Sequence, residues 1–273
     1  MKNKKKILLV TIVIVFLLIA CDMRLKTVIY NIDSDKIDSK ITIAFISDLH
    51  SDWYGENQKN LIKAVEKANP DVVLLGGDIF DEEKEYDNAE ITLRELSERY
   101  SCYYVTGNHE YWGKDVKNIL DIVRSYGITI LDGRCETIEI NGQKINICGV
   151  DDRDADIYLA EQDSIVEQLN YVDEEADDKY FTILMSHRPE LIDKYEQYDF
   201  DLVLSGHAHG GQWRIPFLLN GTYAPDQGPF PKYAGGQYDY EGGTMIVSRG
   251  LTRTSPPVPR IFNRPELVIV VVE

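Results

Sequence analysis

The placement of histidine constrains this chain more than any other feature of its sequence. All five histidines lie in short polar motifs: Asp48-Leu49-His50, Gly107-Asn108-His109-Glu110, the lone His187, and Gly206-His207-Ala208-His209. A further motif, Gly77-Asp78, adds a carboxylate. Histidine is the commonest metal ligand and a frequent acid or base in catalysis. A chain that places every histidine beside carboxylates and amides predicts one metal site.

Each motif directly follows an apolar run with the composition of a β-strand. Strands are expected over 41–46, 71–75, 102–106, 180–185 and 201–204, and helices over 56–68, 88–100 and 114–126. Alternating strands and helices predict an α/β domain with a largely parallel sheet. Ligands of such sheets bind at the carboxyl ends of the strands. This topology therefore brings motifs that are distant in the sequence to one edge.

The second half of the chain has a different pattern. Strands are expected over 128–131, 137–140 and 144–150, and Asn141-Gly142 is typical of the turn between the last two. A helix is expected over 154–169, a loop rich in Gly, Pro and Tyr over 212–243, and closing strands over 244–248 and 266–272. No second domain boundary appears, so residues 41–273 are predicted to form one domain.

The first 21 residues have the pattern of a targeting segment. Four lysines lie within Met1 to Lys6, and residues 7–20 are apolar apart from Thr11. This apolar stretch is short for a membrane-spanning helix. It ends at Leu18-Ile19-Ala20-Cys21, which resembles the lipobox of bacterial lipoproteins, with Cys21 as the lipidated residue. An uncleaved N-terminal anchor is the alternative.

Either form of this segment predicts attachment to the cell membrane. The basic end favours a cytoplasmic N-terminus and a domain on the outer side of the membrane. Residues 22–40 are polar and weakly patterned, and they are expected to form a tether or a first strand.

Charge and cysteine content narrow the class further. The formal net charge is −17, and the lysines and arginines are scattered without a basic stripe. Such a chain repels nucleic-acid phosphates, so a dedicated nucleic-acid binder is not expected. Besides Cys21 there are Cys102, Cys135 and Cys148. We interpret these three as small buried apolar residues. A disulfide between Cys135 and Cys148 across the hairpin is the alternative in an oxidising compartment.

The motifs contain the ligand types that borderline divalent metals prefer, namely carboxylate, imidazole and amide oxygen. Asp48 and His50 are two residues apart, so at a strand end both side chains are expected to point the same way. The same argument applies to His207 and His209. Asn108 and its neighbour His109 face different directions, and different roles are expected for them.

Taken together and in this order, the motifs resemble the signature of the calcineurin-like metallophosphoesterases. The resemblance covers about residues 41–273. The segments 210–212, 223–228 and 248–251 resemble a compact, membrane-associated bacterial branch of that family. The resemblance implies a four-layer α/β/β/α sandwich of two mixed sheets.

The resemblance also implies roles for single residues. One divalent metal is held by Asp48, His50 and His209, and a second by Asn108, His187 and His207. Asp78 bridges the two metals, and His109 faces the substrate and assists the leaving group. Asp81 stands where purple acid phosphatases have an iron-binding Tyr, so manganese, ferrous iron or zinc is expected instead.

The function expected is therefore a membrane-tethered hydrolase of phosphate ester or pyrophosphate bonds. Two adjacent metals stabilise an in-line displacement at phosphorus and activate a water. The substrate is a phosphorylated small molecule or lipid, and the oligomeric state is left open. Three supporting roles are expected: Asp52 or Glu110 orients His109, Arg249 or Arg253 binds phosphate, and the aromatic residues of 212–243 surround the substrate. The alternative is a non-catalytic, metal-dependent binding or scaffold protein on the same fold.

Overall fold

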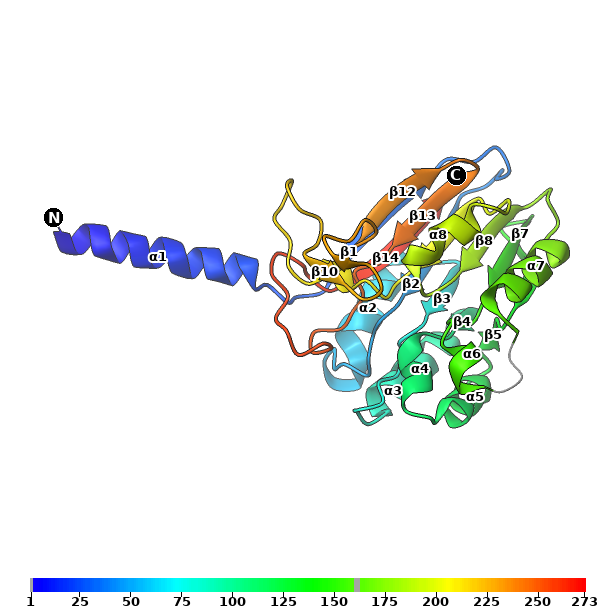
Figure 1. Cartoon of the computed structure of the whole chain (residues 1–273), viewed down its shortest axis with the longest axis horizontal. Helices are drawn as coiled ribbons and strands as arrows, with labels where there is room; N and C mark the ends of the chain where they lie inside the picture. The colour runs from blue at the N-terminus through cyan, green and yellow to red at the C-terminus, as the bar shows by residue number, and fades with distance from the viewer. Residues whose placement is uncertain (1, 160–162) are drawn as a thin grey trace.

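Two six-stranded mixed sheets lie face to face at the centre of the protein (Figure 1). The computed structural model describes residues 2–159 and 163–273. The first sheet has the strand order β1 (Lys26–Ile32), β14 (Glu266–Val272), β2 (Ile41–Ile46), β3 (Val72–Gly76), β4 (Cys102–Val105) and β5 (Thr129–Ile130). Neighbouring strands in it are parallel, except that β14 runs antiparallel to β2.

The second sheet contains the strands of the C-terminal half. Its order is β12 (Gly236–Tyr240), β13 (Gly243–Val247), β9 (Leu202–Ser205), β8 (Phe181–Met185), β7 (Gln143–Gly149) and β6 (Arg134–Ile140). The four central strands are mutually parallel, and each edge strand is antiparallel to its neighbour. A separate ribbon pairs β10 (Tyr223–Ala224) with β11 (Gly228–Pro229).

Helices cover the outer face of each sheet and complete four layers. The α-helices are α1 (Lys2–Ala20), α2 (Lys59–Ala68), α3 (Asp87–Ser97), α4 (Asn108–Trp112), α5 (Val116–Ser125), α6 (Ala155–Tyr158), α7 (Ile165–Glu175) and α8 (Ile192–Tyr195). Short 3₁₀ turns are η1 (Glu56–Gln58), η2 (Pro189–Leu191) and η3 (His209–Gly211). Helices α2, α3 and α5 pack on the first sheet, and α7 and α8 pack on the second. The expected α/β/β/α sandwich is confirmed.

The alternation of side chains along each strand explains this layering. On β2 and β3, Ala44 and Val73 face the helices, whereas Phe45 and Leu74 lie in the core between the sheets. Because both faces are covered, these strands are fully buried and read as continuous apolar runs.

Several expectations for single elements need correction. The helix expected over 154–169 is two helices, α6 and α7, and residues 160–162 between them lie outside the described residues, as does residue 1 of the leader. Ser164 caps α7, and its side chain accepts a hydrogen bond from the Glu167 N–H, which is why a new helix begins there. The loop expected over 212–243 contains β10 and β11 and ends in edge strand β12. Residues Lys26–Ile32 form β1 rather than only a tether.

The cysteines also differ from the favoured interpretation. Cys135 and Cys148 are cross-strand partners on β6 and β7 and form a disulfide, with Cα atoms 3.9 Å apart. Only Cys102 is a buried free thiol, and Cys21 is free and exposed.

The leader forms helix α1, which projects away from the sandwich (Figure 1). Within the described ranges, no helix combines the length and apolar character needed to cross a membrane.

Candidate metal centre

The five motifs meet where strands of both sheets end. The first three follow β2, β3 and β4 of the first sheet, and the last two follow β8 and β9 of the second. Residues that are up to 161 positions apart, from Asp48 to His209, therefore line one edge of the sandwich.

Among the described residues, four groups of side chains lie close enough to hold a metal ion, and two of them consist entirely of expected ligands. The first contains Asp48, His50, Asp78 and His209, and the second contains Asp78, His187 and His207. Within each group the ligand atoms lie within 4.8 Å of one another. Asp78 belongs to both, since its Oδ2 lies 3.6 Å from His50 Nε2 and 3.0 Å from His187 Nε2. The geometry thus brings six of the seven expected ligands into two adjoining groups that share one carboxylate.

Buried polar atoms without partners test whether these residues suit a metal. Such an atom occurs in five of the seven expected ligands: Asp48 Oδ2, His50 Nε2, Asp78 Oδ2, Asn108 Oδ1 and His187 Nε2. A buried acceptor without a partner costs about 1–3 kcal/mol. Two divalent cations between these side chains satisfy all five atoms. The residues therefore fit two such ions, and Asn108, although in neither group, presents a free oxygen.

Each carboxylate of the centre divides its two oxygens between different tasks. Asp48 Oδ1 accepts the His207 N–H at 2.9 Å, and Asp78 Oδ1 accepts the His109 N–H at 2.9 Å. The Oδ2 atoms remain without hydrogen-bond partners. Backbone hydrogen bonds thus orient both carboxylates and leave one oxygen of each for a metal.

The backbone at the centre is strained. Five of the seven expected ligands have left-handed φ values between 47° and 63°: Asp48, His50, Asp78, His207 and His209. This region is unfavourable for residues other than glycine, and such strain is typical of functional sites. Asp48 and His50 lie in one group, as expected, whereas His207 and His209 lie in different groups and do not reach the same ion site. The local reason differs, because these residues lie in left-handed turns beyond the strands and not on a continued strand.

Every histidine of the centre has one ring nitrogen fixed by an acceptor. The Nδ1 atoms of four rings lie near Asp81 Oδ2 (His50, 3.0 Å), Glu82 Oε2 (His109, 2.6 Å), the Gly76 carbonyl (His187, 2.8 Å) and the Ser255 carbonyl (His209, 3.0 Å). In metal sites such acceptors set the tautomer and the direction of the ring. In these four residues Nε2 is the free nitrogen.

His207 is oriented the opposite way. Its Nε2 lies 3.1 Å from Asp226 Oδ2, which leaves Nδ1 for the metal side. Asp226 is itself held by Arg188 at 2.6 Å and by Arg153 at 2.6 Å. Arg188 is buried and also donates two hydrogen bonds to Asp152, at 2.7 and 2.8 Å. Sequence reasoning missed Asp226 and Arg188; the only available signal was the position of Arg188 next to His187.

Electrostatics favour positive charge between the carboxylates. Burial lowers the pKa of His187, but the charge of Asp78 more than reverses this effect and raises the pKa to about 10. Positive charge near Asp78 is favourable. Either a proton on His187 or a divalent cation beside it supplies that charge. Burial also lowers the pKa of His109, yet the charges of Asp78 and Glu82 raise it above its usual value.

The residues expected to orient His109 have other partners. The carboxylate of Glu110 accepts the N–H groups of Asp78, Ile79, Phe80 and Gly107 and the Tyr104 hydroxyl. Glu110 therefore holds the loop that carries Asp78. Asp52 accepts hydrogen bonds from Lys84 and from the loop at Arg253 and Thr254. Glu82 is the carboxylate that contacts His109 Nδ1.

A cleft of about 300 Å³ opens above the ligand groups. Its lining combines polar residues of the centre with apolar side chains: Asp78, Glu82, Glu83, Asn108, His109, Trp112, His207, His209, Gln212, Tyr223, Pro225, Ser255, Pro256 and Pro257. Of the aromatic residues expected around the substrate in 212–243, only Tyr223 lines it. Arg249 is paired with Glu266, and Arg253 stacks on the Tyr54 ring, so neither lines the cleft.

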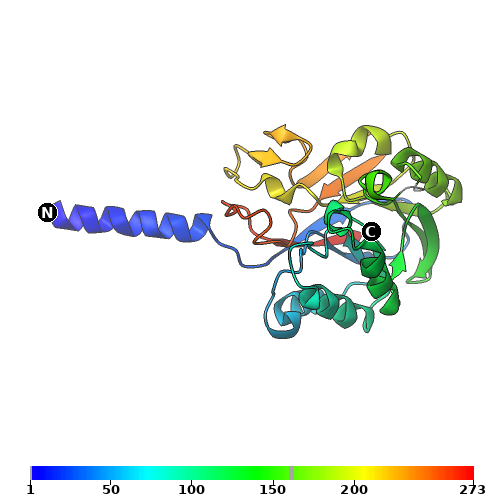
Figure 2. The same cartoon turned by 60° about the horizontal axis from the view of Figure 1, so that its bottom comes forward.

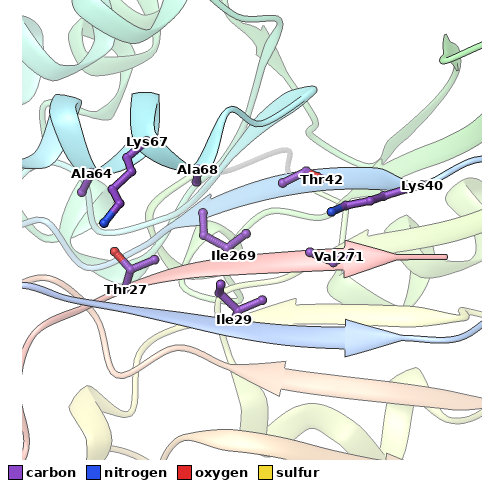
Figure 3. Close-up of a pocket in the computed structure, with 9 residues that line it drawn as sticks. All are labelled: Thr27, Ile29, Lys40, Thr42, Ala64, Lys67, Ala68, Ile269 and Val271. Atoms are coloured by element: carbon purple, nitrogen blue, oxygen red, sulfur yellow. The ribbon is translucent and has the colours of Figure 1, made fainter.

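A second hollow, of about 330 Å³, lies on the outer face of the first sheet beside α2 (Figure 3). Its floor contains Ile29, Ile269 and Val271, and Lys40 and Lys67 stand at its sides. No carboxylate or imidazole lines it, so it offers no metal chemistry.

The fold and the ligand groups define a metal-binding α/β sandwich hydrolase. Residues 41–211 match the family model described as calcineurin-like phosphoesterase. A metallophosphoesterase of Aquifex aeolicus is 32% identical over 256 residues, covering 89% of this chain and 90% of that protein. YkuE of Bacillus subtilis, also a metallophosphoesterase, is 30% identical to this chain. The match covers 83% of this chain and 77% of YkuE. The chain belongs to the calcineurin-like phosphoesterase family and is a metal-dependent phosphoester hydrolase.

Two further matches give the limits of this likeness. A metallophosphoesterase of Helicobacter pylori is 32% identical over 79% of this chain, which spans 55% of that protein's length. Among solved structures, the phosphopantetheinyl hydrolase of Mycobacterium tuberculosis has a TM-score of 0.52 at 13% identity, covering 82% of this chain and 96% of that one. At this identity the likeness supports the fold alone.

Proposed function

We propose that this protein is a membrane-tethered phosphoesterase of the cell envelope with a dinuclear metal centre. The observation that carries the proposal is the convergence of ligands from five motifs around Asp78, four of which contribute a buried polar atom without a hydrogen-bond partner. We assign Asp48, His50 and His209 to one ion and Asn108, His187 and His207 to the other. Asp78 bridges them.

Two divalent ions of manganese, iron or zinc, once bound, supply Lewis-acid stabilisation of the phosphoryl oxygens and an activated water. The remaining chemistry belongs to the chain. His109 lines the cleft with its Nε2 free, and its Nδ1 contacts Glu82. Because its Nδ1 contacts the Glu82 carboxylate, the ring is suited to carry a proton on Nε2 and to donate it to the leaving oxygen. Glu82 holds the ring in position.

Residues 1–21 provide the attachment, either through lipid on Cys21 or as the uncleaved helix, and residues 22–40, which include β1, connect it to the domain. Helix α1 exposes its large apolar side chains, which supports attachment to a membrane. The Cys135–Cys148 disulfide suits an oxidising compartment and supports a location outside the cytoplasm. A phosphorylated small molecule or lipid of the envelope is the expected substrate.

Metal analysis followed by a substrate panel tests this function. We expect two divalent ions per chain and, with manganese added, turnover of a chromogenic phosphomonoester, a phosphodiester or pyrophosphate. Asp78→Ala serves as the inactive control. A chain loaded with two metals that hydrolyses none of the three contradicts the proposal and favours a metal-dependent binding protein.

A further inference from the structure

Besides the apolar side chains of α1 itself, large apolar side chains are exposed on the domain where this helix joins it. Ala20, at the end of α1, is buried, and its carbonyl accepts the Phe262 N–H at 2.7 Å. The rings of Phe16 and Phe262 lie 5.5 Å apart. The base of the leader thus rests on the segment around Phe262.

A tight hairpin leaves the domain beside this segment. Ile215 and Leu219 exchange backbone hydrogen bonds of 2.8 and 3.0 Å, so residues 216–218 form its tip. Phe217 is fully exposed and Leu218 is 83% exposed. The base of the hairpin is fixed, because Trp213 pairs with Ile261, directly before Phe262. Two adjacent large apolar residues at a rigid tip, with no protein covering them, have the form of a membrane-inserting anchor.

A cationic hollow of about 100 Å³ adjoins the hairpin and the leader. It is lined by four basic residues and one acidic residue, together with Phe262: Lys26, Arg214, Arg249, Arg264 and Glu266. Glu266 is paired with Arg249, and Arg264 lies 3.5 Å from Asp22, whereas the Lys26 side chain makes no ion pair among the described residues. In a chain of net charge −17, this local excess of positive charge is a distinct feature. Clustered cations next to an apolar anchor attract anionic lipid headgroups.

The metal centre lies next to the same surface. Gln212 lines the cleft and is followed directly by Trp213 at the base of the hairpin. Pro257 also lines the cleft, and two residues further on the Pro259 carbonyl accepts the Trp213 Nε1–H at 2.9 Å. Figures 1 and 2 both place α1 and the segments around β10 at the same end of the molecule.

From these contacts we infer that the hairpin tip, residues 216–218, and the cationic hollow form a surface that docks on an anionic lipid bilayer. The tip inserts between the lipids and the hollow takes a headgroup phosphate. The cleft then opens at the membrane surface, where phosphate esters of membrane lipids are presented to it. This inference rests on the proposed tether and adds an orientation to it.

Fluorescence quenching by brominated lipid in the full chain tests the docking. The chain is mixed with vesicles of three parts phosphatidylcholine to one part phosphatidylglycerol, and flotation reports the tether separately. We expect quenching that disappears in Trp213→Phe, which assigns it to the hairpin base. The double variant Phe217→Ser/Leu218→Ser should still float but lose about half of the quenching or more. Ile157→Ser, at a residue that is 75% exposed on α6, is the matched control and should behave as the unchanged chain.

A charge reversal tests the hollow. Lys26→Glu should lower quenching in the vesicles with phosphatidylglycerol but not in vesicles of pure phosphatidylcholine. Lys40→Glu, at an exposed lysine of the second hollow beside α2, should change quenching in neither. The docking is refuted if the hairpin variant is quenched like the unchanged chain, if Lys26→Glu has no effect, or if the chain does not float. Turnover of a soluble chromogenic ester, measured in parallel, separates these failures from failure of the catalytic proposal.

Discussion

The contact between Glu82 and His109 allows a quantitative test of the catalytic assignment. The Nδ1 and Oε2 atoms are 2.6 Å apart, and the two side chains are only 14% and 22% exposed. A hydrogen bond to a charged group in such surroundings contributes about 1.5–3 kcal/mol. If Glu82 acts by holding His109, Glu82→Gln should lower kcat by about 10- to 150-fold, since each 1.4 kcal/mol is a factor of ten.

The leaving group makes the test specific. A proton from His109 is most important for an alkoxide, which leaves poorly, and less important for a nitrophenolate. We therefore expect the full loss with an alkyl phosphate ester and a smaller loss with a nitrophenyl ester. His109→Ala should lose about 10²–10⁴-fold on the alkyl ester while retaining both metals. The double variant Glu82→Gln/His109→Ala should be no slower than His109→Ala alone, because Glu82 acts only through the His109 ring.

Glu83→Gln is the matched control. Glu83 lines the same cleft and is the next residue in the chain, but its carboxylate makes no hydrogen bond to a histidine among the described residues. Removal of its charge should leave kcat within about twofold of the unchanged enzyme. Equal losses in the two glutamate variants, or fully additive losses in the double variant, would refute the positioning role of Glu82.

Four further outcomes are expected. Asp78→Ala should lose both metals, whereas Asn108→Ala should retain the one assigned to Asp48, as measured by elemental analysis. Asp226→Asn should weaken binding of the second metal by about 10- to 100-fold in a titration, because a neutral amide replaces the charged carboxylate that accepts from His207. Burial, together with nearby acidic charge, raises the pKa of Asp151 from its ordinary value of 3.8 to about 7. Between these two pH values the folded chain retains a proton that the unfolded chain has released. Stability should therefore fall as pH rises through this range, and Asp151→Asn should flatten the dependence of Tm on pH. Thiol titration of the unfolded, unreduced and unlipidated chain should find two free thiols, Cys21 and Cys102, and a count of four would contradict the disulfide.

The expected ligands could be read from the sequence because of where they stand. Each is a polar residue that interrupts the chain directly after an apolar strand, as Asp78 does after β3. The parallel order of such strands then decides which edge they share. The second sheet was available only from the family resemblance, because no local pattern fixes how two sheets stack.

The partners of those ligands could not be read in the same way. Asp226 lies in a Gly- and Pro-rich loop, and its contact with His207 depends on how that loop folds back over β9. Glu82 and Glu110 are both acidic neighbours of the centre, and only packing decides that Glu82 reaches His109. The four basic residues of the cationic hollow are similarly scattered between Lys26 and Arg264. The sequence therefore shows no basic cluster, although the fold brings these residues together.

Hydrogen bonds from distant segments hold the strained backbone of the centre in place. Asp48, Asp78 and His207 each have left-handed φ values, at about 1–3 kcal/mol each. Backbone hydrogen bonds from distant segments compensate: Asp48 N–H reaches the Gly77 carbonyl, and Thr252 N–H reaches the Asp48 carbonyl. The carboxylate of Glu110 secures the loop of Asp78. Because these bonds join the ends of β2 and β3 to each other and to the segments that follow β4 and β13, they direct the ligand atoms inward, where divalent cations would supply the positive charge that the buried carboxylates lack.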